Sequence, residues 1–239
     1  MTSTPPSSGT IALVGSGEFL SPIQSLDQKL LAHIQGPPHV VVLPTASAPD
    51  GPGVPERWAQ MGVTHFEQLG VHVEPVMLLT REDADKPSIV KQIMAANFVY
   101  FSGGKPRYLL ETLRDTAAWA AVVQVYNSGG VVAGCSAGAM AMGGAVFDFP
   151  KLWRILPALG LAPGLAVIPH FDEIPKVMLA TLNHTHVHIT VVGVDGSTAL
   201  VGREGRWTVY GRGCVTVFEG KQRVRYSEGQ EVILRIDEQ

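Results

Sequence analysis

The chain of 239 residues contains only two cysteines, Cys135 and Cys214. Two cysteines at this spacing give neither a disulfide framework nor the paired pattern of a zinc site. No apolar run reaches about 18 residues, the length that a membrane-spanning helix needs. Residues 1–10, MTSTPPSSGT, have no basic segment followed by an apolar one, so we expect no signal peptide. These absences favour a soluble protein in the reducing environment of the cytoplasm.

Charge is also scarce. Charged residues make up 16% of the chain, and the formal net charge at pH 7 is −3. Nucleic acids and anionic membranes are bound by clustered basic side chains, so we expect neither as a partner. Hydrophobic residues make up 46% of the chain, which is enough to bury a large core. We expect a disordered tail at residues 1–9 and a single α/β domain at residues 10–239.

What the sequence does contain is an alternation of apolar strands and amphipathic helices. Strand-like stretches occur at residues 10–19, 39–47, 71–79, 97–104 and 131–136. Helical spacing occupies residues 21–36 and 107–130, and the second of these ends at Gly129-Gly130. Continuous apolar strands separated by such helices predict a parallel sheet with both faces covered.

The last third of the chain, from residue 189, has a different pattern. Short strand-like runs are divided by Gly-containing turns at Asp195-Gly196, Glu204-Gly205 and Glu219-Gly220. Such turns are typical of antiparallel hairpins. We therefore expect a β-hairpin extension at the C-terminal end of the α/β domain.

One serine lies in a run of small residues. Gly134-Cys135-Ser136-Ala137-Gly138 matches the pattern G-x-S-x-G between an apolar strand and a helix-compatible segment. In a nucleophile elbow this pattern makes a tight turn that projects the serine hydroxyl above the sheet, and the next amide, here that of Ala137, stabilises an oxyanion. The structural alternative is that small residues simply let a helix pack closely on a strand.

A second Gly-rich turn, Gly103-Gly104, also joins a strand to a helix. In a doubly wound sheet such joints lie along one edge, where ligands bind. We choose the Gly104 amide as the second oxyanion donor. An ordinary strand-to-helix turn is an equally good interpretation of these two glycines.

Serine needs a neighbouring base to become a nucleophile, and histidine is the usual one. The stretch GLAVIPHFDE places His170 at the end of an apolar strand, at the same edge of the sheet as Ser136. The alternative is a histidine that merely caps a turn. The earlier histidines are expected to lie on the surface: His33, His39, His65 and His72.

A histidine cluster follows in NHTHVHIT, where His184, His186 and His188 share one face of a strand pattern. Three such histidines can bind zinc, but the sequence provides no fourth ligand beside them. A solvated or interface-facing strand explains the cluster better. We therefore expect no metal centre and no cofactor.

These stretches together resemble the S51 family of serine peptidases, which includes aspartyl dipeptidase (peptidase E) and cyanophycinase. The resemblance covers about residues 11–215 and rests on LPTAS, FSGGKPRYLLETL, GCSAGAMAMG, LGLAPGLAVIPHFD and VGVDGSTAL. It implies a flavodoxin-like, doubly wound, mostly parallel sheet related to class I glutamine amidotransferases. It also implies Ser136 as nucleophile, His170 as base, and Gly104 and Ala137 as oxyanion donors.

The chain departs from the family pattern at the third member of the triad. The family usually has a glutamate where GVDGSTAL places Gly196. Asp195, one position earlier, is our choice for the triad acid, and Glu204 in the GREG turn is the alternative. Neighbouring strand residues face opposite sides, so Asp195 needs a bulge or turn to reach the site.

Specificity is the second departure. Aspartyl dipeptidases carry an Arg-bearing segment after Pro-His-Phe, whereas this chain has only Lys176 as a cation there. We expect a serine peptidase, a dipeptidase or exopeptidase, that cleaves short peptides, with a homodimer as its candidate assembly. The alternatives are a differently specific hydrolase, like cyanophycinase or an amidotransferase, and a non-catalytic sensor. An amidotransferase would use a cysteine, but Cys135 lies one residue before the elbow position.

Overall fold

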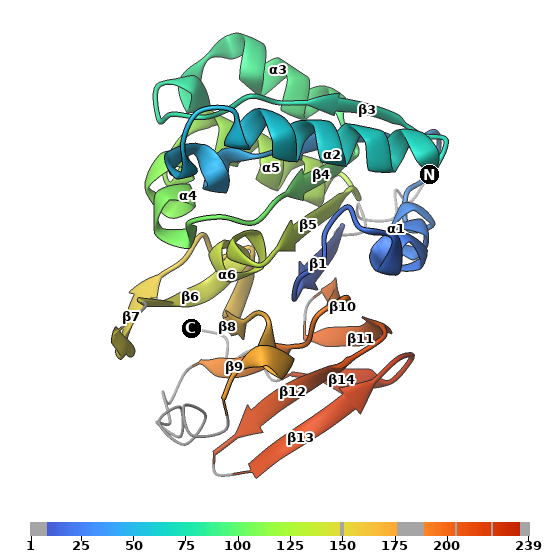
Figure 1. The fold of residues 1–239 in the computed structure, drawn as a ribbon, viewed down its shortest axis with the longest axis vertical. Coiled ribbons are helices and arrows are strands. Elements are labelled where there is room, and N and C mark those ends of the chain that lie inside the picture. The colour runs from blue at the N-terminus through green and yellow to red at the C-terminus, as the bar shows by residue number, and fades with distance from the viewer. Residues whose placement is uncertain (1–8, 149–150, 176–188, 204, 221, 235–239) are drawn as a thin grey trace, which may run out of the picture.

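The structure is a computed structural model that describes residues 9–148, 151–175, 189–203, 205–220 and 222–234. Within these ranges, no helix is both long and apolar enough to cross a membrane. The chain forms two sheets with helices packed around the first of them (Figure 1).

The larger sheet has eight strands in the order β14-β11-β10-β1-β5-β4-β2-β3. Its parallel part consists of β1 (Thr10–Val14), β2 (His39–Leu43), β3 (His72–Pro75), β4 (Phe98–Phe101) and β5 (Val131–Cys135). The antiparallel part consists of β10 (Thr198–Arg203), β11 (Arg206–Gly211) and β14 (Glu231–Ile233). The predicted flavodoxin-like sheet with a C-terminal hairpin extension is confirmed.

Helices cover both faces of the parallel strands because alternate side chains of each strand point to opposite sides. Val40 and Val42 of β2 pack in one buried cluster with α1 (Gln24–Leu31) and α2 (Val54–Gln68). Val41 and Leu43 belong to the other cluster, which includes α3 (Pro87–Ala95), α4 (Pro106–Leu113) and α5 (Ala117–Asn127). Short 3-10 helices complete the connections: η1 (Ser21–Ile23), η2 (Thr45–Asp50), η3 (Asp83–Asp85) and η4 (Phe171–Glu173).

The helical stretch expected at residues 107–130 is divided into α4 and α5. Asp115 between them has a φ of 57°, which a helix does not allow. Thr116 then starts the new helix, because its hydroxyl accepts a hydrogen bond from the amide of Trp119 at 3.3 Å. The helical spacing of the sequence is continuous, but the Thr116 side chain binds a helix amide and so begins a separate helix.

A second sheet of six strands, in the order β13-β12-β9-β8-β6-β7, was not predicted. Its strands are β6 (Gly143–Asp148), β7 (Lys151–Pro157), β8 (Ala162–Ile168), β9 (Thr190–Val194), β12 (Cys214–Glu219) and β13 (Gln222–Ser227). Two of the expected hairpins exist, β10–β11 and β12–β13. The third is wrong: the Asp195-Gly196 turn leads from β9 in the second sheet to β10 in the first.

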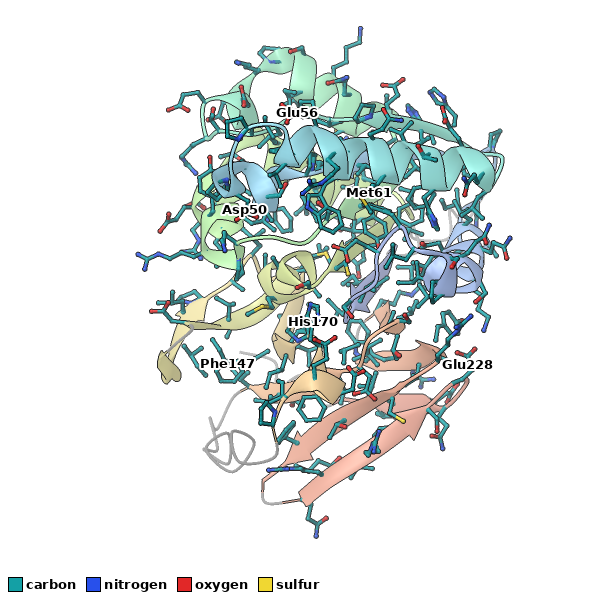
Figure 2. All side chains as sticks on the ribbon, in the orientation of Figure 1. Asp50, Glu56, Met61, Phe147, His170 and Glu228 are labelled. Carbon is teal, nitrogen blue, oxygen red and sulfur yellow. The ribbon has the colours of Figure 1, made fainter. Side chains whose placement is uncertain are left out.

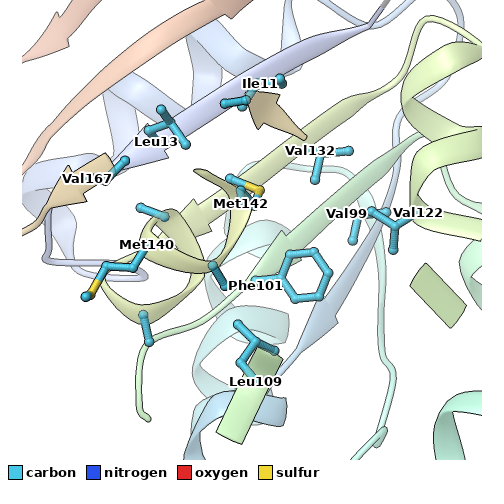
Figure 3. Close-up of a cluster of buried hydrophobic side chains, with 14 of the residues drawn as sticks. Ile11, Leu13, Val99, Phe101, Leu109, Val122, Val132, Met140, Met142 and Val167 are labelled. Carbon is cyan, nitrogen blue, oxygen red and sulfur yellow. The ribbon is translucent and has the colours of Figure 1, made fainter. Parts of the chain in front are cut away.

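The short helix α6 (Ala137–Met142) lies at the junction of the two sheets. Figure 3 shows Met140 and Met142 of this helix among buried side chains that include Phe101 of β4 and Val167 of β8. Every residue of α6 is buried. The residue that precedes α6, Ser136, is therefore fixed by packing from both sheets.

Candidate active site

Ser136 occupies a sharp turn between β5 and α6. Its φ of 51° and ψ of −108° lie in a region that costs a residue with a side chain about 1–3 kcal/mol. The turn is held because the Ser136 amide donates to Val14 O and the Met140 amide donates to Ser136 O, each at 3.0 Å. Glycine is required at position 134, where a Cβ would lie 2.5 Å from the carbonyl carbon of Gly138. This is the geometry of a nucleophile elbow.

His170 meets this serine from the second sheet. It follows β8 and caps η4 in a left-handed conformation, with φ 51° and ψ 37°. Its Nε2 lies 3.2 Å from Ser136 Oγ, within reach for proton transfer. Figure 2 shows His170 close to α6, in the region between the two sheets. The structure thus brings together the two residues that the sequence suggested as nucleophile and base.

The other imidazole nitrogen faces a carboxylate that the sequence reasoning missed. His170 Nδ1 lies 3.4 Å from Glu173 Oε1, three residues further along the chain. Both side chains are exposed, with 42% and 67% of their surfaces accessible. An exposed carboxylate is well solvated, so its electrostatic interaction with the imidazole ring is weak. The signal that could have found Glu173 is its place in PHFDE, one turn after His170.

Asp195, our choice for the triad acid, lies elsewhere. Its carboxylate accepts a hydrogen bond from the Cys214 amide at 2.9 Å and lies 3.5 Å from the Arg225 guanidinium. Within the described residues, no hydrogen bond or ion pair joins Asp195 to His170. Glu204, the alternative acid, lies outside the described residues.

Asp172 links the His170 segment to the position where the family pattern has its glutamate. The amide of Gly196 donates a hydrogen bond to Asp172 Oδ1 at 2.8 Å. The β9–β10 turn is therefore attached to η4, immediately after His170. Sequence reasoning did not anticipate this bond, because it treated the Asp195-Gly196 turn as a hairpin.

Glu18 is a second carboxylate that the sequence reasoning missed. It follows the Gly-rich turn after β1, and only 6% of its surface is exposed. Glu18 Oε1 accepts a hydrogen bond from the Gly103 amide at 2.8 Å, and Oε2 accepts one from Cys135 Sγ at 2.9 Å. Glu18 therefore connects three segments of the site: the turn after β1, the loop after β4 and the end of β5.

Cys135 is buried beside this carboxylate. Burial, and then the negative charge of Glu18, raise the pKa of the Cys135 thiol well above its usual value. A thiol in this state is not a nucleophile, since only the thiolate reacts. The environment of Cys135 therefore argues against the amidotransferase alternative.

Gly104, one of the two expected oxyanion donors, lies in the loop between β4 and α4. Glu18 binds the Gly103 amide, and the Lys105 amide donates to Ala46 O at 2.6 Å. The Gly104 amide between them makes no hydrogen bond with any described residue. Gly104 has a φ of 143°, and a Cβ there would lie 2.2 Å from Ala46 O. Glycine is thus required at position 104.

The other donor, Ala137, is the first residue of α6, so its amide has no acceptor within that helix. An amide in this position, directly after the nucleophile, is the usual donor at an elbow. The Ala137 amide is thus free to donate a hydrogen bond to an oxyanion, as is the Gly104 amide, in agreement with the role expected for both.

A comparison with known protein families identifies the family of this chain. The model of peptidase family S51 matches residues 11–210. The chain belongs to peptidase family S51. As a member of this family, it is a serine-type peptidase. No protein with a curated description matches the sequence.

Two solved structures are similar to the fold of this chain. A peptidase from an acI-B1 Actinobacterium is 31% identical, with a TM-score of 0.87, over 97% of this chain and 99% of that one. A protein from Listeria monocytogenes EGD-e, described as a candidate peptidase E, is 20% identical, with a TM-score of 0.61, over 92% and 99%. At that identity the second likeness shows the fold alone.

Several expectations fall on parts of the chain that are not described. They concern most of the N-terminal tail, the cation Lys176 and the three histidines His184, His186 and His188. Gly9, the last residue assigned to the tail, belongs to the folded part, since its amide donates to Tyr126 O at 2.8 Å.

Proposed function

We propose that this S51 peptidase cleaves short peptides with Ser136 as nucleophile and His170 as general base. The observation that carries the proposal is the 3.2 Å distance between Ser136 Oγ and His170 Nε2. Family membership supports peptide hydrolysis, and the strained backbone at both residues is typical of functional positions.

In the proposed reaction, Ser136 Oγ attacks the peptide carbonyl carbon while its proton moves to His170 Nε2. The carbonyl oxygen becomes an oxyanion that accepts hydrogen bonds from the Gly104 and Ala137 amides. When the intermediate collapses, the C–N bond breaks and His170 returns the proton to the leaving amine. A water molecule, activated by the same imidazole, then hydrolyses the acyl-enzyme and releases Ser136.

We assign the carboxylate at His170 Nδ1 to Glu173 rather than to Asp195. The third member of a triad holds the imidazole in the correct tautomer and stabilises its positive charge. Glu173 Oε1 is the carboxylate oxygen placed at 3.4 Å from Nδ1. Distances between catalytic groups are often long before substrate binds and shorten in the complex.

Short peptides are proposed as substrates because the chain resembles the peptidase E group within the family. A mixed peptide library of different lengths, digested and then analysed by mass spectrometry, tests this directly. We expect cuts at a fixed distance from one terminus, in peptides of a few residues, with wild-type protein and not with Ser136→Ala. Cytoplasmic location and a homodimer stay predictions.

The same digest addresses the alternatives. Cuts that occur only in long or branched polymers would reject short-peptide specificity and retain the serine mechanism. No cuts with either protein would favour a non-catalytic sensor that binds peptides.

A further inference from the structure

A cluster of two histidines and one glutamate lies at the end of the large sheet that is opposite to Ser136. His39 is the first residue of β2, and it is paired in register with His72, the first residue of the parallel strand β3. Ser136 instead follows the last residue of β5. We propose that His39, His72 and Glu74 bind a divalent transition-metal ion, with zinc as the best match.

Strand geometry brings the three side chains to one face. Paired residues on neighbouring parallel strands lie side by side, and Glu74 follows His72 by two positions, so it points in the same direction. The ring centroids of His39 and His72 are 4.4 Å apart. The metal-binding atoms that the three side chains offer all lie within 4.8 Å of one another.

The distances are close to those of a tetrahedral site. Glu74 Oε1 lies 3.2 Å from His72 Nε2 and 3.8 Å from His39 Nε2. Zinc is bound by imidazole nitrogen and carboxylate oxygen at about 2.0–2.2 Å, so two ligands of a tetrahedron lie about 3.3 Å apart. Small rotations of the exposed His72 and Glu74 side chains are enough to bring both within coordination distance.

His39 is already prepared to be a ligand. Its Nδ1 lies 2.9 Å from Ala95 O, and since a carbonyl only accepts, Nδ1 carries the proton. The lone pair of the neutral ring is then on Nε2. Metal-binding histidines are oriented in the same way by a carbonyl or carboxylate at the other nitrogen.

The Nε2 atom of His39 supplies a second observation. It is buried and has no hydrogen-bond partner among the described residues. A buried acceptor without a partner is unfavourable, and a cation bound between the rings would satisfy it. Two imidazoles and one carboxylate suit zinc better than magnesium or calcium, which prefer oxygen ligands.

Metal at this site would connect the edge of the sheet to its interior. β3 is the last strand in the sheet order (Figure 1), and it supplies His72 and Glu74, whereas β2 supplies His39. We therefore expect zinc to stabilise the folded protein without changing its catalytic site. The sequence did not suggest this cluster, because only the strand order brings His39 beside His72.

The test is zinc binding by the full chain, measured by isothermal titration calorimetry and by the melting temperature. Because His184, His186 and His188 could bind zinc in any conformation, all three are first replaced by Gln in the reference protein. We expect this protein to bind one zinc ion per chain and to melt at a higher temperature with zinc. Adding His72→Gln should weaken binding about tenfold or more and abolish the rise in melting temperature.

Glu74→Gln should act in the same direction as His72→Gln, and Glu67→Gln on α2 serves as a control that leaves binding unchanged. Cobalt provides an independent readout, since a bound Co²⁺ ion absorbs visible light when its nitrogen and oxygen ligands are tetrahedral. The proposal is overturned if the reference protein binds no zinc, or if His72→Gln binds it as tightly as the reference does.

Discussion

The Gly196 amide donates a 2.8 Å hydrogen bond to Asp172 Oδ1, although the two residues belong to different connections of the fold. Asp172 is two positions after His170, and Gly196 stands where the S51 pattern has an acid. A backbone-to-carboxylate bond thus links the turn that carries His170 to the place where the S51 pattern has its acid.

This bond predicts a positioning role for Asp172. Asp172→Ala removes the acceptor and frees η4 from the β9–β10 turn, so we expect kcat to fall about tenfold while KM changes little. Asp172→Asn keeps an acceptor oxygen and should remain near the wild-type rate. Steady-state kinetics on one short peptide measures both. If Asp172→Asn loses as much activity as Asp172→Ala, the charge of Asp172 is what matters.

Glu173 and Asp195 are distinguished by a pair of conservative variants. We expect Glu173→Gln to lower kcat about tenfold, less than for a buried triad acid, because Glu173 is solvent-exposed. Asp195→Asn should leave kcat near wild type and lower the melting temperature, since it weakens the contacts with Cys214 and Arg225. A loss of a thousandfold or more in folded Asp195→Asn would instead make Asp195 the triad acid.

Cys135 should be unreactive toward alkylating agents in the folded protein. Its pKa is raised well above the usual value, so at pH 8 the group remains a thiol and cannot be alkylated. We expect iodoacetamide to leave Cys135 unmodified in the folded protein and to modify it after denaturation, as peptide mass spectrometry would show. Rapid alkylation of native Cys135 at pH 8, with loss of activity, would contradict this.

Glu18 should contribute both stability and rate. Glu18→Ala leaves the buried Gly103 amide without its acceptor, at a cost of about 1–3 kcal/mol in the free energy of unfolding. The neighbouring Gly104 amide then loses its fixed position, so kcat/KM should also fall. Glu18→Gln keeps an oxygen acceptor and should lose less of both. Denaturant unfolding and peptide kinetics test the pair, and equal behaviour of the two variants would reject the hydrogen-bond explanation.

Much of the first sheet could be predicted because its strands are continuous apolar runs. The four residues of β4 and the five of β5 are buried on both faces. Their sequences are therefore continuously apolar and do not show the apolar–polar alternation of strands that have one face in water. The elbow at Ser136 was predictable for another local reason: the tight turn admits only small residues around the serine, and these are visible in the sequence.

The second sheet was not predictable in the same way. β6 and β8 pair in parallel with a register shift. The chain passes from β9 in the second sheet to β10 in the first at Asp195-Gly196, a dipeptide that locally favours a hairpin. Tertiary packing decided between two conformations that local turn chemistry permits. The contacts of Glu18 with Gly103 and Cys135 likewise depend on strand order, which no local pattern encodes.

The most direct test of Ser136 as the nucleophile is to find which atom carries the acyl group. Wild-type protein is mixed with a peptide that it cleaves, and the reaction is quenched with acid within the first turnover. The intact chain and its fragments are then analysed by mass spectrometry. We predict an increase equal to the acyl part of the peptide, located on Ser136 and absent from Ser136→Ala. An acyl group on another residue, or hydrolysis by Ser136→Ala at the wild-type rate, would contradict the assignment of Ser136 as the nucleophile.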